Sequence, residues 1–195
     1  MDQMSETDPT DEALLIAFSN GDASAGRDLI NRLGPRLLGY AARVLGDKAE
    51  AEDAVQETMV KLWKVANDWR QGEAKVSTWA YRVLINHCTD RLRRRKIRGA
   101  VDLDSIAEPE ADLKSAVEQM TEKDRADALQ NALTELPERQ RQAVVLRHLE
   151  GLSNPEIAEV MDIGVEAVES LTARGKRALK AALNGRKDEL GYAHG

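Results

Sequence analysis

The sequence of 195 residues predicts an all-α protein, in which a small helical bundle and a helix-turn-helix domain are joined by a flexible acidic linker. Only 4% of the residues are aromatic, and no stretch shows the sustained β-branched alternation of a strand. Proline and glycine fall mainly between segments of helical periodicity. An acidic stretch that contains proline then separates two groups of such segments.

The first domain is predicted at residues 11–98. Thr10 or Asp11 can cap a first helix that runs through Ser19. A second helix is expected at residues 23–33. A third is expected at residues 35–46, where a proline in the first turn is tolerated.

A fourth helix is predicted at residues 47–66, because its apolar or small residues recur in pairs four apart and form one stripe. A polar loop at residues 67–75 follows. Ser77 or Thr78 can cap a fifth helix that reaches Arg98. The predicted buried stripe of the fourth helix consists of Ala54, Val55, Thr58, Met59, Leu62, Trp63 and Ala66, and the fifth helix can turn Trp79, Val83, Cys88 and Leu92 inward.

The linker between the domains is predicted at residues 99–121. Residues 101–130 carry nine acidic and three basic side chains, so their net charge of −6 equals that of the whole chain. The flanking segments are therefore nearly neutral and hold local basic clusters. A negative total charge does not exclude nucleic-acid binding when the charge is distributed in this way.

The second domain is predicted at residues 122–184, followed by a tail at residues 185–195. A short helix is expected at Leu129–Leu136 and another at Glu138–Leu149, each followed by a residue that breaks helices. Residues 154–183 have the spacing of a helix-turn-helix.

The helix-turn-helix prediction rests on the contact between its two helices, which must be lined with apolar or small side chains. Asp162 and Gly164 lie in the turn. We expect Gly164 to supply backbone freedom there, and aspartate tolerates the left-handed region better than most residues. An ordinary helical hairpin with a solvated charged face is the alternative on this spacing alone. The residues at the expected contact are Ile157, Ala158, Met161, Ile163, Val168 and Leu171.

The end of the fifth helix, RLRRRKIR, forms a second candidate surface for nucleic acid. Arg91, Arg94, Arg95 and Arg98 share one face because they are three and four residues apart. Such a cationic edge can neutralise phosphates, which makes binding depend steeply on salt. The simpler alternative is a basic helix end that the macrodipole favours.

Several classes of function find no support in the sequence. Cys88 is the single cysteine, so no intramolecular disulfide can form, and we expect it to be a small buried hydrophobic residue. No metal-spaced Cys/His set, glycine-rich phosphate loop or nucleophile motif is present, which predicts a protein that is not an enzyme and needs no metal or cofactor. The acidic lead at residues 1–10 is expected to be disordered and lacks the features of a secretory signal. No apolar run approaches the length of a membrane span, so we do not expect a membrane protein. With a single cysteine, nothing suggests an oxidising compartment, and we expect a cytoplasmic location.

Three blocks of the sequence together resemble one family. They are AEDAVQETMVKLWK, STWAYRVLINHCTDRLRRRK and LPERQRQAVVLRHLEGLSNPEIAEVMDIGVEAVESLTARGKRAL. In this order and separation they are similar to the sigma-2 and sigma-4 domains of extracytoplasmic-function (ECF, group 4) sigma factors of the sigma-70 family. The resemblance extends over residues 11–183.

The resemblance implies a subunit that gives RNA polymerase its promoter specificity, opens DNA and initiates transcription of a stress or envelope regulon. The implied partners are core RNA polymerase, at the clamp helices of its largest subunit and at its beta flap, promoter DNA, and a cognate anti-sigma factor. The residues implied to bind the core enzyme are Asp53, Gln56 and Glu57. Those implied at the minus-ten element are Trp79, Arg82, Asn86, Asp90, Arg93, Arg94 and Arg95, with the loop at residues 71–75. Those implied at the minus-thirty-five element are Arg147, Glu169, Ser170, Arg174, Lys176 and Arg177.

This chain departs from the family pattern in its second helix-turn-helix helix. Where many members carry a basic residue followed by Ser-Arg-Leu, it has Glu169–Thr172, and Glu166 replaces a frequent glycine. Acids can accept hydrogen bonds from cytosine amino groups but repel phosphates, so the DNA sequence read can differ from the usual one. The alternative function is a stand-alone LuxR-like helix-turn-helix regulator, which would bind duplex DNA tightly without polymerase.

Overall fold

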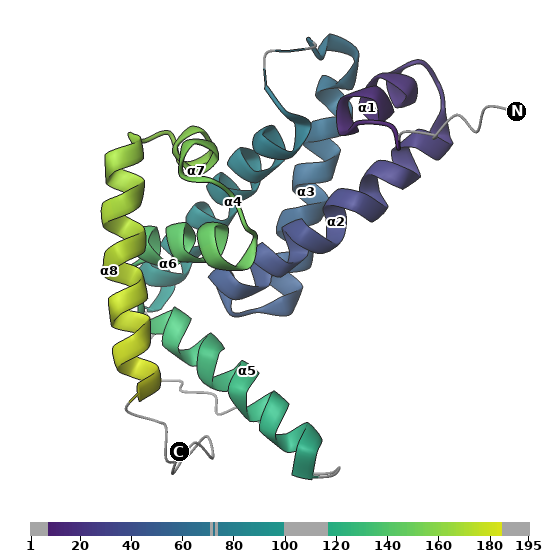
Figure 1. Ribbon diagram of the computed structural model, residues 1–195. Helices are drawn as coiled ribbons and strands as arrows, with labels where there is room; N and C mark the ends of the chain where they lie inside the picture. Colours follow the sequence, from purple (N-terminus) through teal and green to yellow (C-terminus); the bar gives the residue numbers. More distant parts are fainter. Residues whose placement is uncertain (1–7, 71, 73, 100–116, 185–195) are drawn as a thin grey trace, which may run out of the picture.

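A computed structural model describes residues 8–70, 72, 74–99 and 117–184, and the side chains of all of these except 99 and 117–122. These residues form helices and no strand, which confirms the all-α prediction (Figure 1). The helices are α1 Asp11–Ser19, α2 Ala23–Leu45, α3 Lys48–Val65, α4 Val76–Gly99, α5 Val117–Glu135, α6 Glu138–Val144, α7 Asn154–Met161 and α8 Val165–Asn184, with a 3-10 turn η1 at Ala66–Asp68 and a π-helical turn η2 at Val145–Leu149.

Helices α1, α3 and α4 pack against α2 and form the first helical group. Tyr40 of α2 and Tyr81 of α4 meet edge to face inside it, with ring centroids 5.8 Å apart. The predicted helix starts are confirmed at Thr10, which accepts a hydrogen bond from the Ala13 amide, and at Asp47, which accepts one from the Glu50 amide. Each cap satisfies an amide that the first turn leaves without a helical partner.

Helix α2 corrects the prediction of two helices at residues 23–33 and 35–46. It is continuous through Pro35, which lies inside it. Its leucines 29, 33 and 37 are fully or almost fully buried on both sides of the proline. Burying such a side chain contributes about 1.5–3 kcal/mol, so together they outweigh the roughly 3 kcal/mol that an interior proline costs. The helix ends at Gly46, whose φ of 67° is left-handed.

Helix α4 begins at Val76, so the predicted caps Ser77 and Thr78 lie instead in its first turn. Val76 is 1% exposed and Thr78 is 6% exposed, so both side chains of this first turn pack into the core. Cys88 is buried as predicted. Trp79, Val83 and Leu92 are only half-buried, and the deepest side of the helix consists of Ala80, Tyr81, Leu84, Ile85 and Cys88.

Helix α5 begins at Val117, inside the segment predicted as linker, and is much longer than the helix predicted at residues 129–136. Residues 100–116, which make up most of that linker, lie outside the described residues, as do residues 1–7 and the tail at 185–195. The predicted helix at Glu138–Leu149 corresponds to α6 continued by η2.

Helices α7 and α8 form the predicted helix-turn-helix. Ser153 caps α7 in a complete capping box with Glu156. In the turn, Asp162 takes the left-handed conformation with a φ of 53°, whereas Gly164 does not have a positive φ. The prediction that Gly164 supplies backbone freedom is therefore wrong. Gly175 is the glycine that packing requires, because a Cβ there would lie 2.5 Å from Val144 Cγ2 and 3.2 Å from the Gln140 carbonyl oxygen.

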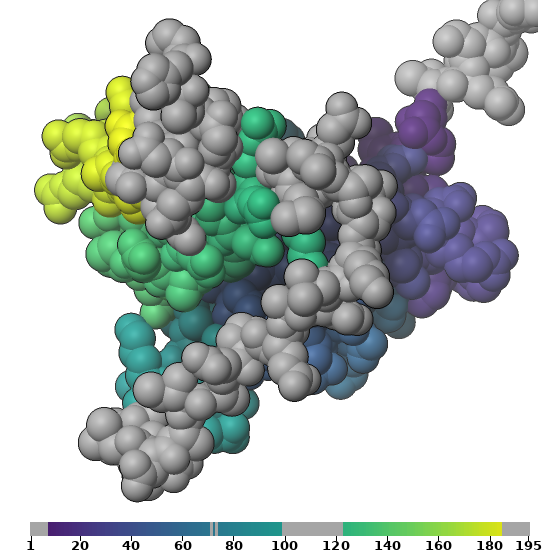
Figure 2. Space-filling view, turned by 90° about the horizontal axis from the view of Figure 1, so that it is seen from below, coloured from purple at the N-terminus to yellow at the C-terminus, as the bar shows by residue number. Residues whose placement is uncertain are grey.

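The two helical groups share one hydrophobic core. Buried side chains of α1–α4 and of α5–α8 form a single cluster, and α7 packs on α4 while α5, α6 and η2 meet α2. In Figure 2, seen from below, green atoms of the second group lie directly against blue and teal atoms of the first. The described parts of the chain therefore adopt a closed arrangement.

Candidate nucleic-acid and protein interfaces

The outer face of α3 presents the first candidate surface. Asp53 and Gln56 are exposed, and one turn later Val60 is 50% exposed although it is apolar. These residues border a shallow hollow of about 400 Å³ that Lys61 and Lys64 also line. Helical periodicity places the whole set on one side of α3, away from the stripe that packs on the core.

Glu57, at the edge of this hollow, connects α3 to α4. Its carboxylate accepts a hydrogen bond of 2.8 Å from Arg91, and its second oxygen lies 3.0 Å from His87 Nδ1. The hydrogen bond from Arg91 lowers the pKa of Glu57, and burial lowers the pKa of His87. At neutral pH an ionised carboxylate therefore faces a neutral imidazole and a guanidinium.

The N-terminal half of α4 carries the second candidate surface. Trp79 is half-buried and packs edge to face on Trp69, with ring centroids 6.1 Å apart. The two rings help to line a hollow of about 280 Å³ beside the loop before α4. Of that loop, Gln71 and Glu73 lie outside the described residues. Arg82, Asn86 and Asp90 are all exposed, spaced four residues apart along one side of α4.

The C-terminal half of α4 brings its arginines together as the spacing predicted. Arg91, Arg94, Arg95 and Arg98 line one hollow of about 150 Å³ with Glu50 of α3. Arg95 is less available to contact DNA than predicted, because it donates hydrogen bonds of 2.8 Å to the Leu45 carbonyl oxygen and to Glu50. Arg93 and Arg94 are exposed.

Helix α8 presents the third candidate surface, along its side away from α6. Glu169, Arg174, Lys176 and Arg177 are exposed, and Ser170 is half-buried. Arg147 lies on η2, outside this helix. It donates a hydrogen bond of 2.9 Å to the Leu152 carbonyl oxygen, which positions the chain that enters α7.

Sequence reasoning missed the contacts between the two helical groups. Arg141 of α6 is 8% exposed and donates a hydrogen bond of 2.7 Å to the Val44 carbonyl oxygen of α2. Gln142, fully buried, donates to Thr89 Oγ1 of α4 at 3.0 Å. No periodicity marks either residue as buried, because arginine and glutamine are mostly exposed in proteins.

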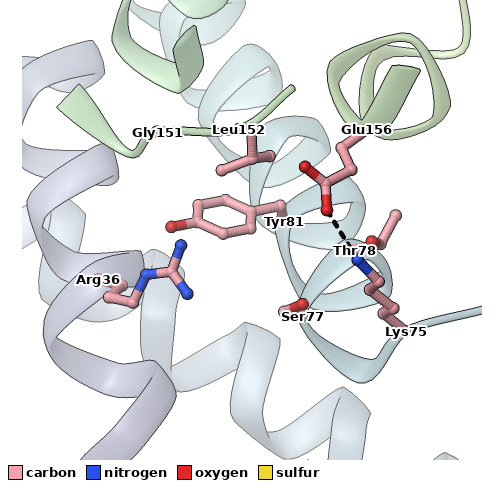
Figure 3. A pocket seen from close by; sticks show the side chains of 8 residues that line it. All are labelled: Arg36, Lys75, Ser77, Thr78, Tyr81, Gly151, Leu152 and Glu156. Carbon is pink, nitrogen blue, oxygen red and sulfur yellow. Dashed lines mark hydrogen bonds and ion pairs between the residues drawn. The ribbon is translucent and has the colours of Figure 1, made fainter. Parts of the chain in front are cut away.

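A cleft of about 260 Å³ lies between the two groups, and Figure 3 shows the residues that line it. The ring of Tyr81 lies between Arg36 and Leu152, and its hydroxyl donates to Glu150 at 2.8 Å. At the other end of the cleft, Lys75 and Glu156 form an ion pair of 2.8 Å. The hydrogen bond from Lys75, followed by those from Ser153 in the capping box, lowers the pKa of Glu156 to about 2.

Comparisons with known proteins identify this arrangement. The models of Sigma-70 region 2 and Sigma-70, region 4 match residues 29–97 and 126–179. The ECF RNA polymerase sigma factor SigM of Mycobacterium tuberculosis is 33% identical over 174 residues, which are 89% of this chain and 85% of that protein. The chain belongs to the ECF sigma factor family.

Other relatives of this sigma factor support the assignment. The RNA polymerase sigma-H factor of Pseudomonas aeruginosa is 31% identical over 91% of this chain and 95% of that protein. The ECF sigma factor SigW of Bacillus subtilis is 29% identical over 84% and 91%. The sigma factor therefore directs transcription initiation and is not an enzyme, and the alternative of a stand-alone regulator is set aside.

Solved structures share the fold of this sigma factor. CnrH, in complex with the cytosolic domain of CnrY, superimposes with a TM-score of 0.67 at 24% identity, over 90% of this chain and 97% of that one. The Bartonella quintana sigma factor RpoE, in complex with the anti-sigma factor NepR, gives 0.62 at 23% identity, over 81% and 96%. In the described part of this sigma factor, no acidic, histidine or cysteine side chains gather as a metal site would require. Among the same residues, no helix has the length and apolarity to span a bilayer.

Proposed function

We propose that this sigma factor binds the clamp helices of the polymerase largest subunit through the outer face of α3. Asp53, Gln56 and Glu57 supply carboxylates and an amide for basic partner residues, and the exposed Val60 supplies apolar contact beside them. Charge complementarity of this kind speeds association and fixes orientation. A contact of region 4 with the beta flap completes the proposal.

We further propose that α4 takes the minus-ten element and α8 the minus-thirty-five element. The exposed Arg82, Asn86 and Asp90 can hold and read an unpaired base of the single strand, next to the two tryptophans and the arginine-rich end of α4. On α8, Arg174 and Lys176 can contact phosphates while Glu169 and Ser170 face base edges.

One observation carries the proposal. The three candidate surfaces lie on three different helices, and most of their polar side chains are exposed. A single subunit can therefore contact polymerase and two promoter elements at the same time, once the helical groups separate to the proper distance.

The proposal extends to regulation and location. We propose a cytoplasmic location, because the core polymerase and promoters that the protein is proposed to bind are found there. We propose control by a cognate anti-sigma factor, because RpoE shares this fold and forms a complex with an anti-sigma factor. A stress or envelope regulon is proposed from the family resemblance alone. The experiment for this part is a pull-down with the product of any small gene that adjoins this one.

A reconstituted holoenzyme tests the polymerase contact. We expect Asp53→Lys with Gln56→Ala to abolish both the pull-down of core enzyme and run-off transcription from genomic promoter fragments. The matched control is Asp28→Lys on α2, an exposed acid outside the three surfaces. Retention of core binding by the α3 variant, with the control also unchanged, would refute the assignment of α3.

A further inference from the structure

In the closed arrangement, acidic side chains of region 4, in the second helical group, lie against basic side chains of the proposed minus-ten surface. Glu156 of α7 lies 2.8 Å from Lys75, just before α4. Asp162, at the end of the same helix, lies 3.8 Å from Arg82 of α4. The charge of Glu159, between these two acids, also acts on Lys75. Three acids spaced by three residues thus follow one edge of α7, over about 9 Å of helix.

These carboxylates are held in position before any ligand arrives. The oxygen Oε2 of Glu156 accepts hydrogen bonds from the Ser153 amide and hydroxyl at 2.9 and 2.8 Å, which turns Oε1 toward Lys75. Asp162 ends α7 in a left-handed conformation that aspartate tolerates. An ionised carboxylate and a phosphate are both anionic acceptors for lysine and arginine, so the acidic edge of α7 offers these cations what a DNA strand would offer.

The two groups also meet through α6. Arg141 and Gln142 of α6 donate hydrogen bonds to the Val44 carbonyl oxygen of α2 and to Thr89 Oγ1 of α4. The ion pairs of α7 are therefore part of a wider contact between the two groups, in which α7 packs on α4.

We propose that region 4 inhibits region 2 within the same chain: the acidic edge of α7 occupies Lys75 and Arg82 and competes with the single strand of the promoter. The inference rests on the proposed role of α4 at the minus-ten element. Polymerase, by separating the two regions, would release both cations at the moment they are needed.

The test measures binding of the full-length chain to single-stranded DNA without polymerase. The probe is a fluorescein-labelled deoxyoligonucleotide pool of random sequence, about 12 nucleotides long. Glu156→Gln with Asp162→Asn removes both carboxylates and keeps the local structure, since glutamine serves in a capping box and asparagine tolerates the left-handed region. We expect its Kd, from fluorescence anisotropy at low salt, to fall about fivefold, the effect of releasing two exposed ion pairs.

A charge-matched control separates competition from net charge. Asp28→Asn with Glu135→Gln also removes two negative charges, at exposed positions on α2 and α5, outside the contact between α4 and α7. We expect the Kd of this control to stay within twofold of the unmodified chain. An equal increase in affinity for the oligonucleotide in both double variants, or an increase in neither, would overturn the inference.

Arg82→Ala, made in the unmodified chain and in the Glu156→Gln, Asp162→Asn background, tests the underlying assignment. Arg82→Ala can weaken DNA binding in both chains while Glu156→Gln with Asp162→Asn does not increase the affinity. Intramolecular competition is then refuted and the minus-ten role of α4 stands. If Arg82→Ala changes binding in neither chain, the role of α4 itself is wrong.

Discussion

The guanidinium of Arg141 donates a hydrogen bond of 2.7 Å to the carbonyl oxygen of Val44, in the last turn of α2. The same side chain donates to the Thr134 and Leu136 carbonyl oxygens at the end of α5. Helix C-terminal carbonyls lack helical partners and carry negative partial charge. One buried cation therefore joins the ends of two helices, one from region 2 and one from region 4.

Arg141→Ala should lower the free energy of unfolding by about 3 kcal/mol, because it leaves three carbonyl groups at a buried site without their donor. The measurement is urea unfolding followed by circular dichroism. Arg139→Ala, on the exposed side of the same helix, should change stability by no more than about 0.5 kcal/mol. Equal losses in the two variants would contradict the bridging role of Arg141.

Gly175→Ala should destabilise region 4 by about 1–3 kcal/mol, since the added methyl overlaps Val144 and the backbone of Gln140. Gly164→Ala is the matched control. No atom lies within 4 Å of its Cβ position, and its φ is not positive, so we expect its melting temperature to stay near that of the unmodified chain. A melting temperature lowered by Gly164→Ala and not by Gly175→Ala would contradict the conclusion that packing requires glycine at position 175 and not at 164.

The stabilising effect of Glu156 should depend on pH. Its pKa in the folded chain is lowered to about 2 from 4.5, so its contribution is complete above about pH 4.5 and is lost as the pH falls toward 2. Unfolding midpoints in urea for the unmodified chain and Glu156→Gln should therefore differ by a constant amount between pH 7 and 5 and converge below 4.5. A difference that persists unchanged to pH 3 would show that the carboxylate charge is not involved.

Arg174→Ala should weaken the holoenzyme at promoters whose minus-thirty-five element is intact. If Arg174 contacts one phosphate, the slope of the logarithm of the binding constant against the logarithm of salt becomes shallower by about 0.9. Filter binding over a salt series measures this slope. Arg27→Ala, an exposed arginine of α2, should leave the slope unchanged. An unaltered slope in Arg174→Ala would remove this residue from the proposed contacts.

Local patterns in the sequence were sufficient for most of the fold. The stripe from Ala54 to Leu62, the caps at Thr10 and Asp47 and the helix-turn-helix spacing are all signals within one or two turns of helix, and each prediction is confirmed. The break predicted at Pro35 failed because burial on both sides of it depends on other helices. The start of α4 at Val76 was missed for the same reason.

The relation between the two regions could not be predicted from the sequence. Arg141 and Gln142 resemble ordinary surface residues of an amphipathic helix, and Lys75 and Glu156 are 81 residues apart. No local sequence pattern links residues that are so far apart in the chain. The candidate surfaces on α3, α4 and α8 were predicted because their residues are neighbours on single helices, although the partners of Glu57 and Arg95 on adjacent helices were not.

The single hydrophobic cluster also bears on the fate of newly made protein. When the regions part, apolar side chains of α2, α6 and η2 that had covered one another meet water. Chains in the open arrangement that are not bound to polymerase would then be prone to aggregate. Sigma factor made in excess of core enzyme stays soluble only as long as it keeps the closed arrangement. When overexpressed, a variant whose substitution separates the two regions should therefore sediment as aggregate, whereas the unmodified chain should stay in the supernatant.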